Sequence, residues 1–96
     1  MIRHICMFKL KEENKAENLA EMISRAQSLY AIESMKSMDV VTNDPSTPDS
    51  NYDICLICDF EDVDHLNAYQ TSPIHVAFGK FVGSIRESRA CIDYKY

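Results

Sequence analysis

Apolar and polar residues alternate along four stretches of the chain, and this two-residue period predicts β-strands. In the first stretch, His4, Cys6 and Phe8 share one face, while Ile5 and Met7 lie on the other. The predicted strands are Ile2–Leu10, Met35–Thr42, Tyr52–Phe60 and Arg89–Tyr96. The segment 43–51 between the second and third strands is dense in Asn, Asp, Ser and Pro, so we expect a loop there.

Two further stretches repeat apolar residues at helical spacing. The first is an amphipathic helix of roughly 17 residues, for which Asn14 and Glu17 are expected to form a capping box. Its predicted buried stripe contains Leu19, Met22, Ile23, Ala26, Leu29 and Tyr30. The second stretch predicts a short helix capped by Asp62, an interruption at Pro73, and a new helix with Ser72 as N-cap and Pro73 in its first turn.

The order of these elements is β-α-β-β-α-β, which predicts one α+β domain over residues 1–96 with a ferredoxin-like fold. Right-handed connections place the first and third strands in the centre of the sheet. Both strands carry apolar residues on both faces, yet the two helices cover only one face. We therefore expect a homodimer in which two sheets pack face to face, and a monomer with a lightly apolar open face is the alternative.

Composition and charge exclude several classes of protein. The chain has 96 residues, a net charge of -5 and scattered Lys and Arg, so no basic patch for nucleic acid is expected. No apolar run approaches the roughly 20 residues that a membrane span needs. The first ten residues lack the features of an export signal, which makes a cytoplasmic location the expectation.

Cysteines and metal-ligating residues do not form a recognisable metal motif in the sequence. Cys55 and Cys58 lie three apart in a predicted strand, so they point to opposite faces and cannot share one zinc ion. We expect the four cysteines to be reduced thiols, because disulfides are rare in a reducing compartment. A zinc site of His4, His75 and Asp93 lacks the usual short spacing. No metal ion or other cofactor is therefore predicted.

Tyr69, His75 and His4 are the candidate catalytic residues. His75 lies in the first turn of a predicted helix, where the positive end of the helix dipole favours a neutral imidazole that can accept a proton. The Tyr69 phenol on an apolar helix face can donate a hydrogen bond to a substrate carbonyl. His4 reaches the same pocket if its face of the strand meets the helices. The alternative is a structural role for each residue in the core or at the helix start.

Three segments carry a family resemblance: Asn67–Gly79, with its Tyr-x5-His spacing, the opening Arg3–Lys11, and the close Cys91–Tyr96. Together they resemble the stress-responsive A/B barrel (Dabb) family over essentially the whole chain. The resemblance implies a dimeric α+β barrel. It departs from the family at Ser72, where members commonly have His.

The resemblance implies a small cytoplasmic homodimer with an apolar cavity, associated with stress tolerance or with binding a small hydrophobic carbonyl compound. Family members of the olivetolic acid cyclase type imply an alternative, a cofactor-free cyclase or aldol-type lyase. In that alternative the matching positions make His75 the general base, Tyr69 the carbonyl donor and His4 a cavity residue. A third interpretation is a structural oligomer whose cavity is filled by side chains. The expected partners are a second copy of the chain and a small ligand, without nucleic acid or membrane.

Overall fold

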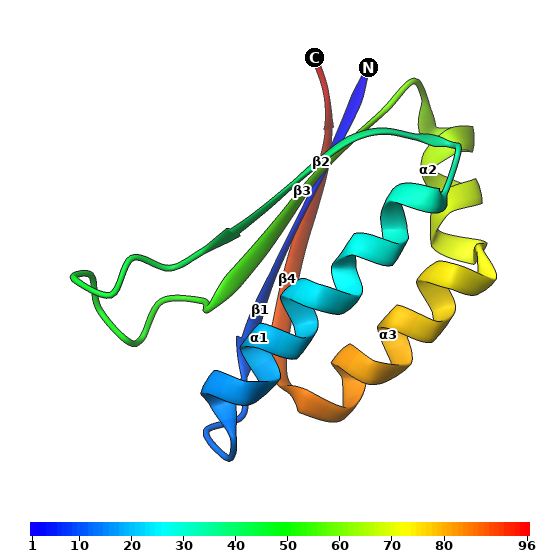
Figure 1. Ribbon diagram of the computed structural model, residues 1–96. Helices are drawn as coiled ribbons and strands as arrows, with labels where there is room; N and C mark the ends of the chain where they lie inside the picture. The colour runs from blue at the N-terminus through cyan, green and yellow to red at the C-terminus, as the bar shows by residue number, and fades with distance from the viewer.

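The computed structural model describes residues 1–96 and consists of one four-stranded antiparallel sheet with helices on one face (Figure 1). This is the predicted ferredoxin-like fold, and the second helical stretch divides in two before Pro73, as predicted. The elements are β1 (Ile2–Leu10), α1 (Lys15–Ala26), the 3₁₀ helix η1 (Gln27–Ala31), β2 (Met35–Thr42), β3 (Ile54–Phe60), α2 (Val63–Thr71), α3 (Pro73–Ile85) and β4 (Arg86–Lys95).

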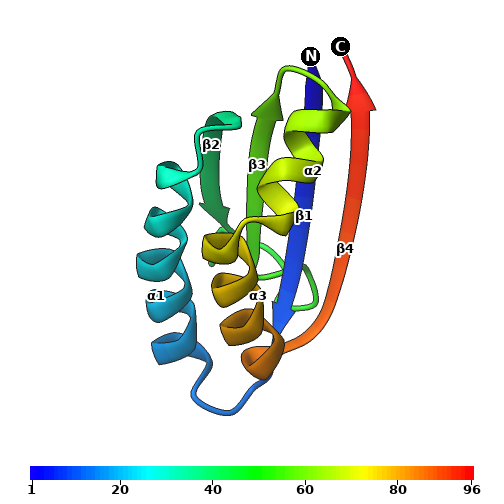
Figure 2. The same ribbon diagram turned by 90° about the vertical axis from the view of Figure 1, so that its right-hand side faces the viewer.

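The strand order is β2-β3-β1-β4, so β1 and β3 are central, as predicted. Figure 2 shows α2 and α3 in front of the central strands, with β4 along an open edge. In this register Cys6 pairs with Leu56 on one side and with Cys91 on the other. The sheet therefore brings residues from opposite ends of the chain next to each other.

The start and end of the first helical stretch differ from the prediction. Asn14 adopts a left-handed conformation, with φ 55°, and its side chain makes no capping hydrogen bond, so the predicted capping box is wrong. Asn tolerates this conformation better than most residues, which lets the chain turn sharply into α1. The last five residues form η1, whose tighter turn leaves Leu29 buried and Tyr30 exposed. Tyr30 donates its hydroxyl hydrogen to the Met38 carbonyl, at 2.9 Å.

The second helical stretch follows the predicted capping. The Asp62 carboxylate accepts a hydrogen bond from the His65 backbone at 2.9 Å and begins α2. The Ser72 hydroxyl accepts from the Ile74 backbone at 3.3 Å and begins α3, with Pro73 in its first turn. These two caps fix the bend between α2 and α3.

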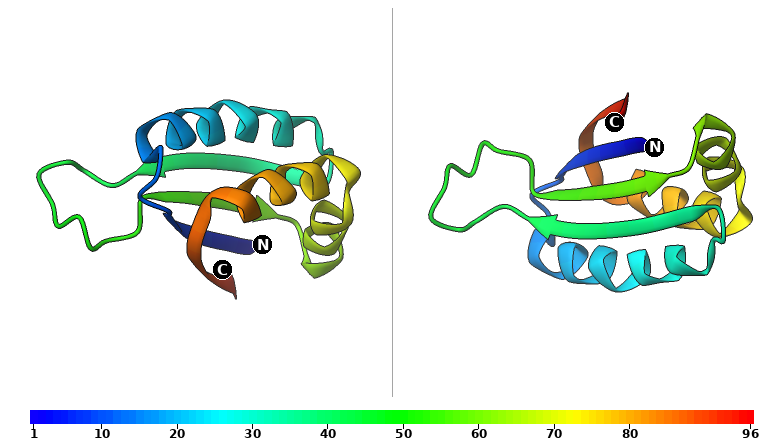
Figure 3. Two further views of the ribbon diagram at one scale, coloured as in Figure 1. Left: turned by 90° about the horizontal axis from the view of Figure 1, so that it is seen from below. Right: turned by 90° about the horizontal axis from the view of Figure 1, so that it is seen from above.

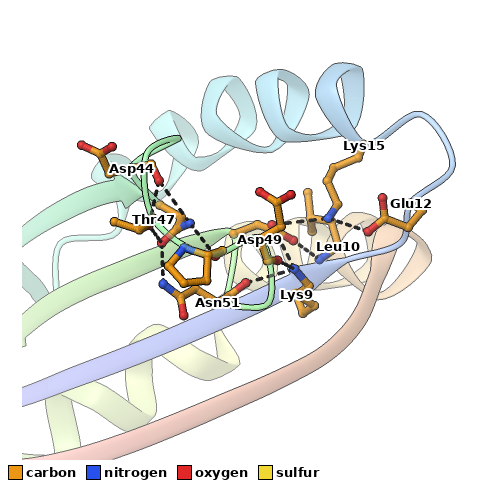
Figure 4. A network of polar contacts seen from close by, with 11 residues as sticks. Lys9, Leu10, Glu12, Lys15, Asp44, Thr47, Asp49 and Asn51 are labelled. Atoms are coloured by element: carbon orange, nitrogen blue, oxygen red, sulfur yellow. Dashed lines mark hydrogen bonds and ion pairs between the residues drawn. The ribbon is translucent and has the colours of Figure 1, made fainter.

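The third and fourth strands begin at other residues than predicted. β3 begins at Ile54 rather than at Tyr52. Directly before it, the Asp53 carboxylate accepts from the Leu10 backbone at 2.7 Å and lies within 3.5 Å of the Lys9 and Lys15 ammonium groups. Figure 4 shows Lys9, Leu10 and Lys15 at this end of the sheet, beside Asp49 and Asn51 of the neighbouring loop. β4 begins at Arg86, directly after α3, rather than at Arg89.

The loop between β2 and β3 extends beyond the end of the sheet, away from α2 (Figure 3). Lys9 Nζ donates to the Asp49 and Asn51 carbonyls at 2.5 and 3.0 Å, which ties the loop to β1. The loop therefore lies at the opposite end of the sheet from the turn between α2 and α3.

The two faces of the sheet differ sharply in burial. On β1 the inner face is buried from Ile2 to Leu10, whereas the residues between are only half-buried. The outer face has no cover within the chain, and Ile92 on β4 is 60% exposed. The apolar residues of this open face are Ile5, Met7, Val41, Cys55, Ile57, Ala90, Ile92 and Tyr94. None of the helices is both long and apolar enough to cross a membrane.

Candidate functional site

A cavity of about 340 Å³ opens between the inner face of the sheet and the helices α2 and α3. Its lining comes from five elements and mixes apolar with polar side chains. The lining residues are His4, Cys6, Phe8, Leu56, Tyr69, Gln70, His75, Phe78, Gly79, Val82, Arg86 and Arg89. The space beside His75 excludes the interpretation of a cavity filled by side chains. The loop 43–51 contributes no residue to this lining.

All three residues singled out in the sequence line this cavity. The Tyr69 ring lies 4.5 Å from the His75 ring and 6.4 Å from the His4 ring, measured between centroids. Tyr69 belongs to the last turns of α2 and His75 to the first turn of α3, so the bend at Ser72 holds their rings together. His4 joins them from β1, because its strand face meets the helices.

Burial sets the ionisation of the phenol and the imidazole. Burial is the main cause that lowers the pKa of His75 below its ordinary value, and electrostatic interactions with His4 and Arg89 act in the same direction. An interaction with the Gln70 backbone partly opposes this shift. Burial also raises the pKa of Tyr69, so the phenol keeps its proton at neutral pH. The site thus presents a neutral proton acceptor beside a proton-bearing hydroxyl.

His4 is buried at 5% exposure, and its Nδ1 is in contact with the Asp93 carboxylate of the neighbouring strand. The register pairs the two residues directly across β1 and β4. The contact occupies Nδ1 and orients the ring, so Nε2 is the nitrogen left for other partners. Sequence analysis named Asp93 only as a zinc ligand and missed this pairing.

The expectation that all four cysteines are reduced thiols is wrong for one pair. Cys6 and Cys91 form a disulfide between β1 and β4, because the register places them directly opposite each other on the inner face. Cys55 and Cys58 are free and lie on opposite faces of β3, as predicted. Burial raises the pKa of Cys58 to about 11, which keeps it a thiol at neutral pH.

Donor atoms of three residues come within 4.8 Å of one another, namely those of His4, Cys6 and Cys91. This group differs from the set of His4, His75 and Asp93 considered in the sequence. Metal ions bind thiolates, and the sulfurs of an intact disulfide are not thiolates. With the disulfide formed, a single imidazole nitrogen remains as a strong ligand.

Sequence reasoning missed two cationic residues of the cavity. Arg86 follows Val82 by one helical turn at the end of α3, a spacing that the sequence contained. Arg89 pairs with Phe8 in the sheet, and its Nη2 lies 3.2 Å from Cys6 Sγ and 3.0 Å from Cys91 Sγ. Its position depends on the β1–β4 register, for which the sequence holds no local signal.

The structure is that of a ferredoxin-like protein with a cavity between its sheet and its helices. The chain belongs to the stress-responsive A/B barrel (Dabb) family, whose model matches residues 2–96. No curated protein matches the chain in sequence.

Solved structures with the same fold include several proteins described as dimers. A dimeric ferredoxin-like protein of unknown function from Bacteroides fragilis NCTC 9343 is 33% identical, with a TM-score of 0.83, and the match covers 99% of this chain and 95% of that one. A Dabb family protein from Mesorhizobium loti is 25% identical, with a TM-score of 0.84 and coverage of 99% and 95%. A hydroxynitrile lyase from Passiflora edulis is 21% identical, with a TM-score of 0.82 and coverage of 97% and 90%. At that identity the last likeness concerns the fold alone.

Proposed function

We propose that this protein binds a small, largely apolar carbonyl compound in the cavity between its sheet and its helices. The observation that carries the proposal is the pairing of Tyr69 with His75, 4.5 Å apart, in the wall of a 340 Å³ cavity. A volume of this size lies in the range of small-molecule sites. Phe8, Leu56 and Phe78 supply the apolar part of the wall, where the hydrocarbon part of a ligand is removed from water.

Tyr69 is the donor that would hold the ligand's carbonyl oxygen. Its hydroxyl interacts with the buried Cys58 thiol, and sulfur is a weak hydrogen-bond acceptor. Exchanging this sulfur for a carbonyl oxygen gains a stronger hydrogen bond inside a water-poor site. Binding therefore needs no loss of a strong interaction within the protein.

A second candidate function is cofactor-free aldol chemistry, as in a cyclase or lyase. The observation that favours it is the lowered pKa of His75, which leaves a neutral base beside the carbonyl position. His75 would take a proton from the carbon next to the carbonyl, and Tyr69 would stabilise the resulting enolate oxygen. The enolate carbon then bonds to a second carbonyl carbon of the same substrate, and the new alkoxide recovers the proton from His75. His4, oriented by Asp93, would position the substrate.

The assembly that fits this function is a homodimer formed through the open sheet face. The uncovered apolar residues of that face, with Ile92 60% exposed, support a second copy as their cover. The dimeric relatives support the same arrangement. We further propose a cytoplasmic location and a role in stress tolerance, for which the family's description is the support.

Hydrogen–deuterium exchange of 2-octanone in deuterated water tests the proposed binding and the proton transfer together. The protein is expected to shift the ketone's NMR signals on binding and to accelerate exchange beside its carbonyl. His75→Ala is expected to abolish the acceleration, whereas Tyr69→Phe weakens ketone binding. His65→Ala is the matched control, because His65 is a half-buried residue of α2 that does not line the cavity. Binding of the ketone without faster exchange would refute the aldol chemistry and support a binding function alone. Absence of ketone binding would refute the proposed binding.

A further inference from the structure

The four arginines of the chain fall into two pairs with different surroundings. Arg3 and Arg25, outside the cavity, form ion pairs with Asp59 and Glu21, each at 2.8 Å. Arg86 and Arg89, which line the cavity, have no carboxylate within ion-pair distance. The cavity therefore carries the two guanidinium groups that the protein itself leaves unpaired.

The lining also contains no Asp or Glu, although the chain has 15 acidic residues and 10 Lys and Arg. The Asp93 carboxylate, which is in contact with His4, lies outside the lining. A cavity with low-dielectric walls concentrates the field of the charges that it contains. The local field is thus positive in a protein whose net charge is -5.

The arginine donors are available to a ligand. One nitrogen of Arg89, Nη2, contacts the sulfurs of Cys6 and Cys91, which are weak acceptors. A guanidinium has five N–H donors, so most of those of Arg89 remain free for an oxyanion. Arg86 has no side-chain hydrogen bond within the protein. A guanidinium with free donors binds a carboxylate through two parallel hydrogen bonds, a geometry that Lys cannot reproduce.

Along α3 the cavity changes from polar to apolar to cationic. His75 lies at the start of the helix, Phe78 and Val82 occupy its middle, and Arg86 follows its end. This order suits a short amphiphile whose hydrocarbon part packs against the middle of α3 while its charged end reaches the arginines. A neutral ketone alone would leave half-buried Arg86 and exposed Arg89 with water as their partner.

We propose that the ligand of this cavity is an anionic amphiphile, a short-chain oxo carboxylate whose carboxylate is bound by Arg86 and Arg89. This inference rests on the proposed binding of a carbonyl compound and narrows its class. Tyr69 would hold the oxo group, and the arginines would hold the carboxylate. The two interactions are made by different residues, so they can be tested apart.

Isothermal titration calorimetry with octanoate and octanamide tests the anion preference on the full chain. The two probes have nearly the same shape and differ in charge, and neither carries a ketone. Wild-type protein is expected to bind octanoate at least about 10-fold more tightly than octanamide, as a charge-assisted hydrogen bond would give. Arg86→Gln and Arg89→Gln should each weaken octanoate binding about 10-fold and leave octanamide binding unchanged.

Arg25→Gln is the matched control, since it removes the same charge from an exposed ion pair outside the cavity. Arg86→Lys and Arg89→Lys keep the charge and should recover part of the octanoate affinity, which guards against a variant that merely folds poorly. Equal affinity for the two probes, or an equal effect of Arg25→Gln, would overturn the inference. If 2-octanone binds but octanoate does not, only the anion preference fails. If octanoate binds through the arginines but 2-octanone neither binds nor exchanges, only the proposed carbonyl function fails. If none of the probes binds, the anion preference and the carbonyl function both fail.

Discussion

The two faces of the sheet are built from the same alternating strands but differ in what covers them. The inner face of β1 buries Cys6, Phe8 and the polar His4 beneath the helices. The outer face leaves Ile5 and Met7 half-buried and without a cover. Neighbouring residues of the strand therefore lie on opposite faces, one in the cavity wall and the next on the open surface.

The two faces also differ in the partners that their polar and apolar side chains find. Under the helices, a polar group needs a partner, and His4 has Asp93. On the open face, charged residues pair with one another, as Arg3 does with Asp59, while the apolar residues between them remain in contact with water. The covered face is completed within the chain, whereas the open face has no cover within the chain.

Truncating one isoleucine on each face of β3 gives the sharpest comparison. Ile54 is 1% exposed under the helices, whereas Ile57 lies half-buried on the open face. Ile54→Ala is expected to lower the free energy of unfolding by about 2–5 kcal/mol, because it leaves a cavity in the core. Ile57→Ala is expected to cost less than half as much at concentrations where the subunits are separate. Urea titration measures both values, and equal losses would contradict the difference between the faces.

The disulfide gives the next largest effect. Cys6 and Cys91 are 85 residues apart in the sequence, and joining them restricts the unfolded chain. Cys91→Ser is expected to lower the free energy of unfolding by about 2–4 kcal/mol. Cys55→Ser, on the open face, is the control and should change it little. Thiol titration of the unreduced, denatured protein should detect Cys55 and Cys58 alone, and detection of all four cysteines would refute the disulfide.

A charge on the open face tests the proposed homodimer. Ile92→Asp is expected to weaken dimerisation about 30-fold, or about 2 kcal/mol, because the carboxylate must be removed from water in the interface. Val76→Asp is the matched control, since Val76 is an exposed apolar residue on α3, away from the sheet. Sedimentation equilibrium measures both dissociation constants. A wild-type protein that sediments at 11.0 kDa at all concentrations would refute the dimer.

The smallest effect concerns the pH dependence of the two histidines on the helices. Burial lowers the pKa of His75, whereas a hydrogen bond with Asp62 raises the pKa of His65. NMR titration should therefore place His75 below the ordinary value of about 6.5 and His65 above it.

The two shifts affect stability in opposite directions. The unfolded chain binds a proton at His75 more readily than the folded chain does, so this residue destabilises the protein as the pH falls below about 6.5. His65 stabilises the folded state below its unfolded pKa, and this contribution is lost as the pH rises through its folded pKa. His75→Ala should remove the loss of stability below about pH 6.5 and leave the contribution of His65 unchanged. An unchanged pH dependence of the free energy of unfolding in this range would contradict the prediction for His75.

Local sequence patterns predicted the features that depend on neighbouring residues. Alternation along Ile2–Leu10 assigned both faces of β1, and the caps at Asp62 and Ser72 placed the bend that joins Tyr69 to His75. Asn14 shows where such patterns fail, because a capping box and a left-handed turn begin with the same residue type. The predicted burial of Tyr30 was wrong for a related reason, because the change from an α-helix to a 3₁₀ helix changes the direction in which the residues of η1 point.

The sequence by itself determined the strands, the two-faced sheet and the candidate residues His4, Tyr69 and His75 of the cavity, because hydrophobic periodicity and capping act over a few residues. Only the tertiary structure decided that Cys6 bonds to Cys91, that Asp93 meets His4, and that Arg89 enters the cavity. All three contacts join β1 to β4, from opposite ends of the chain. The pairing register of β1 with β4 brings these residues together, and no short stretch of sequence encodes that register.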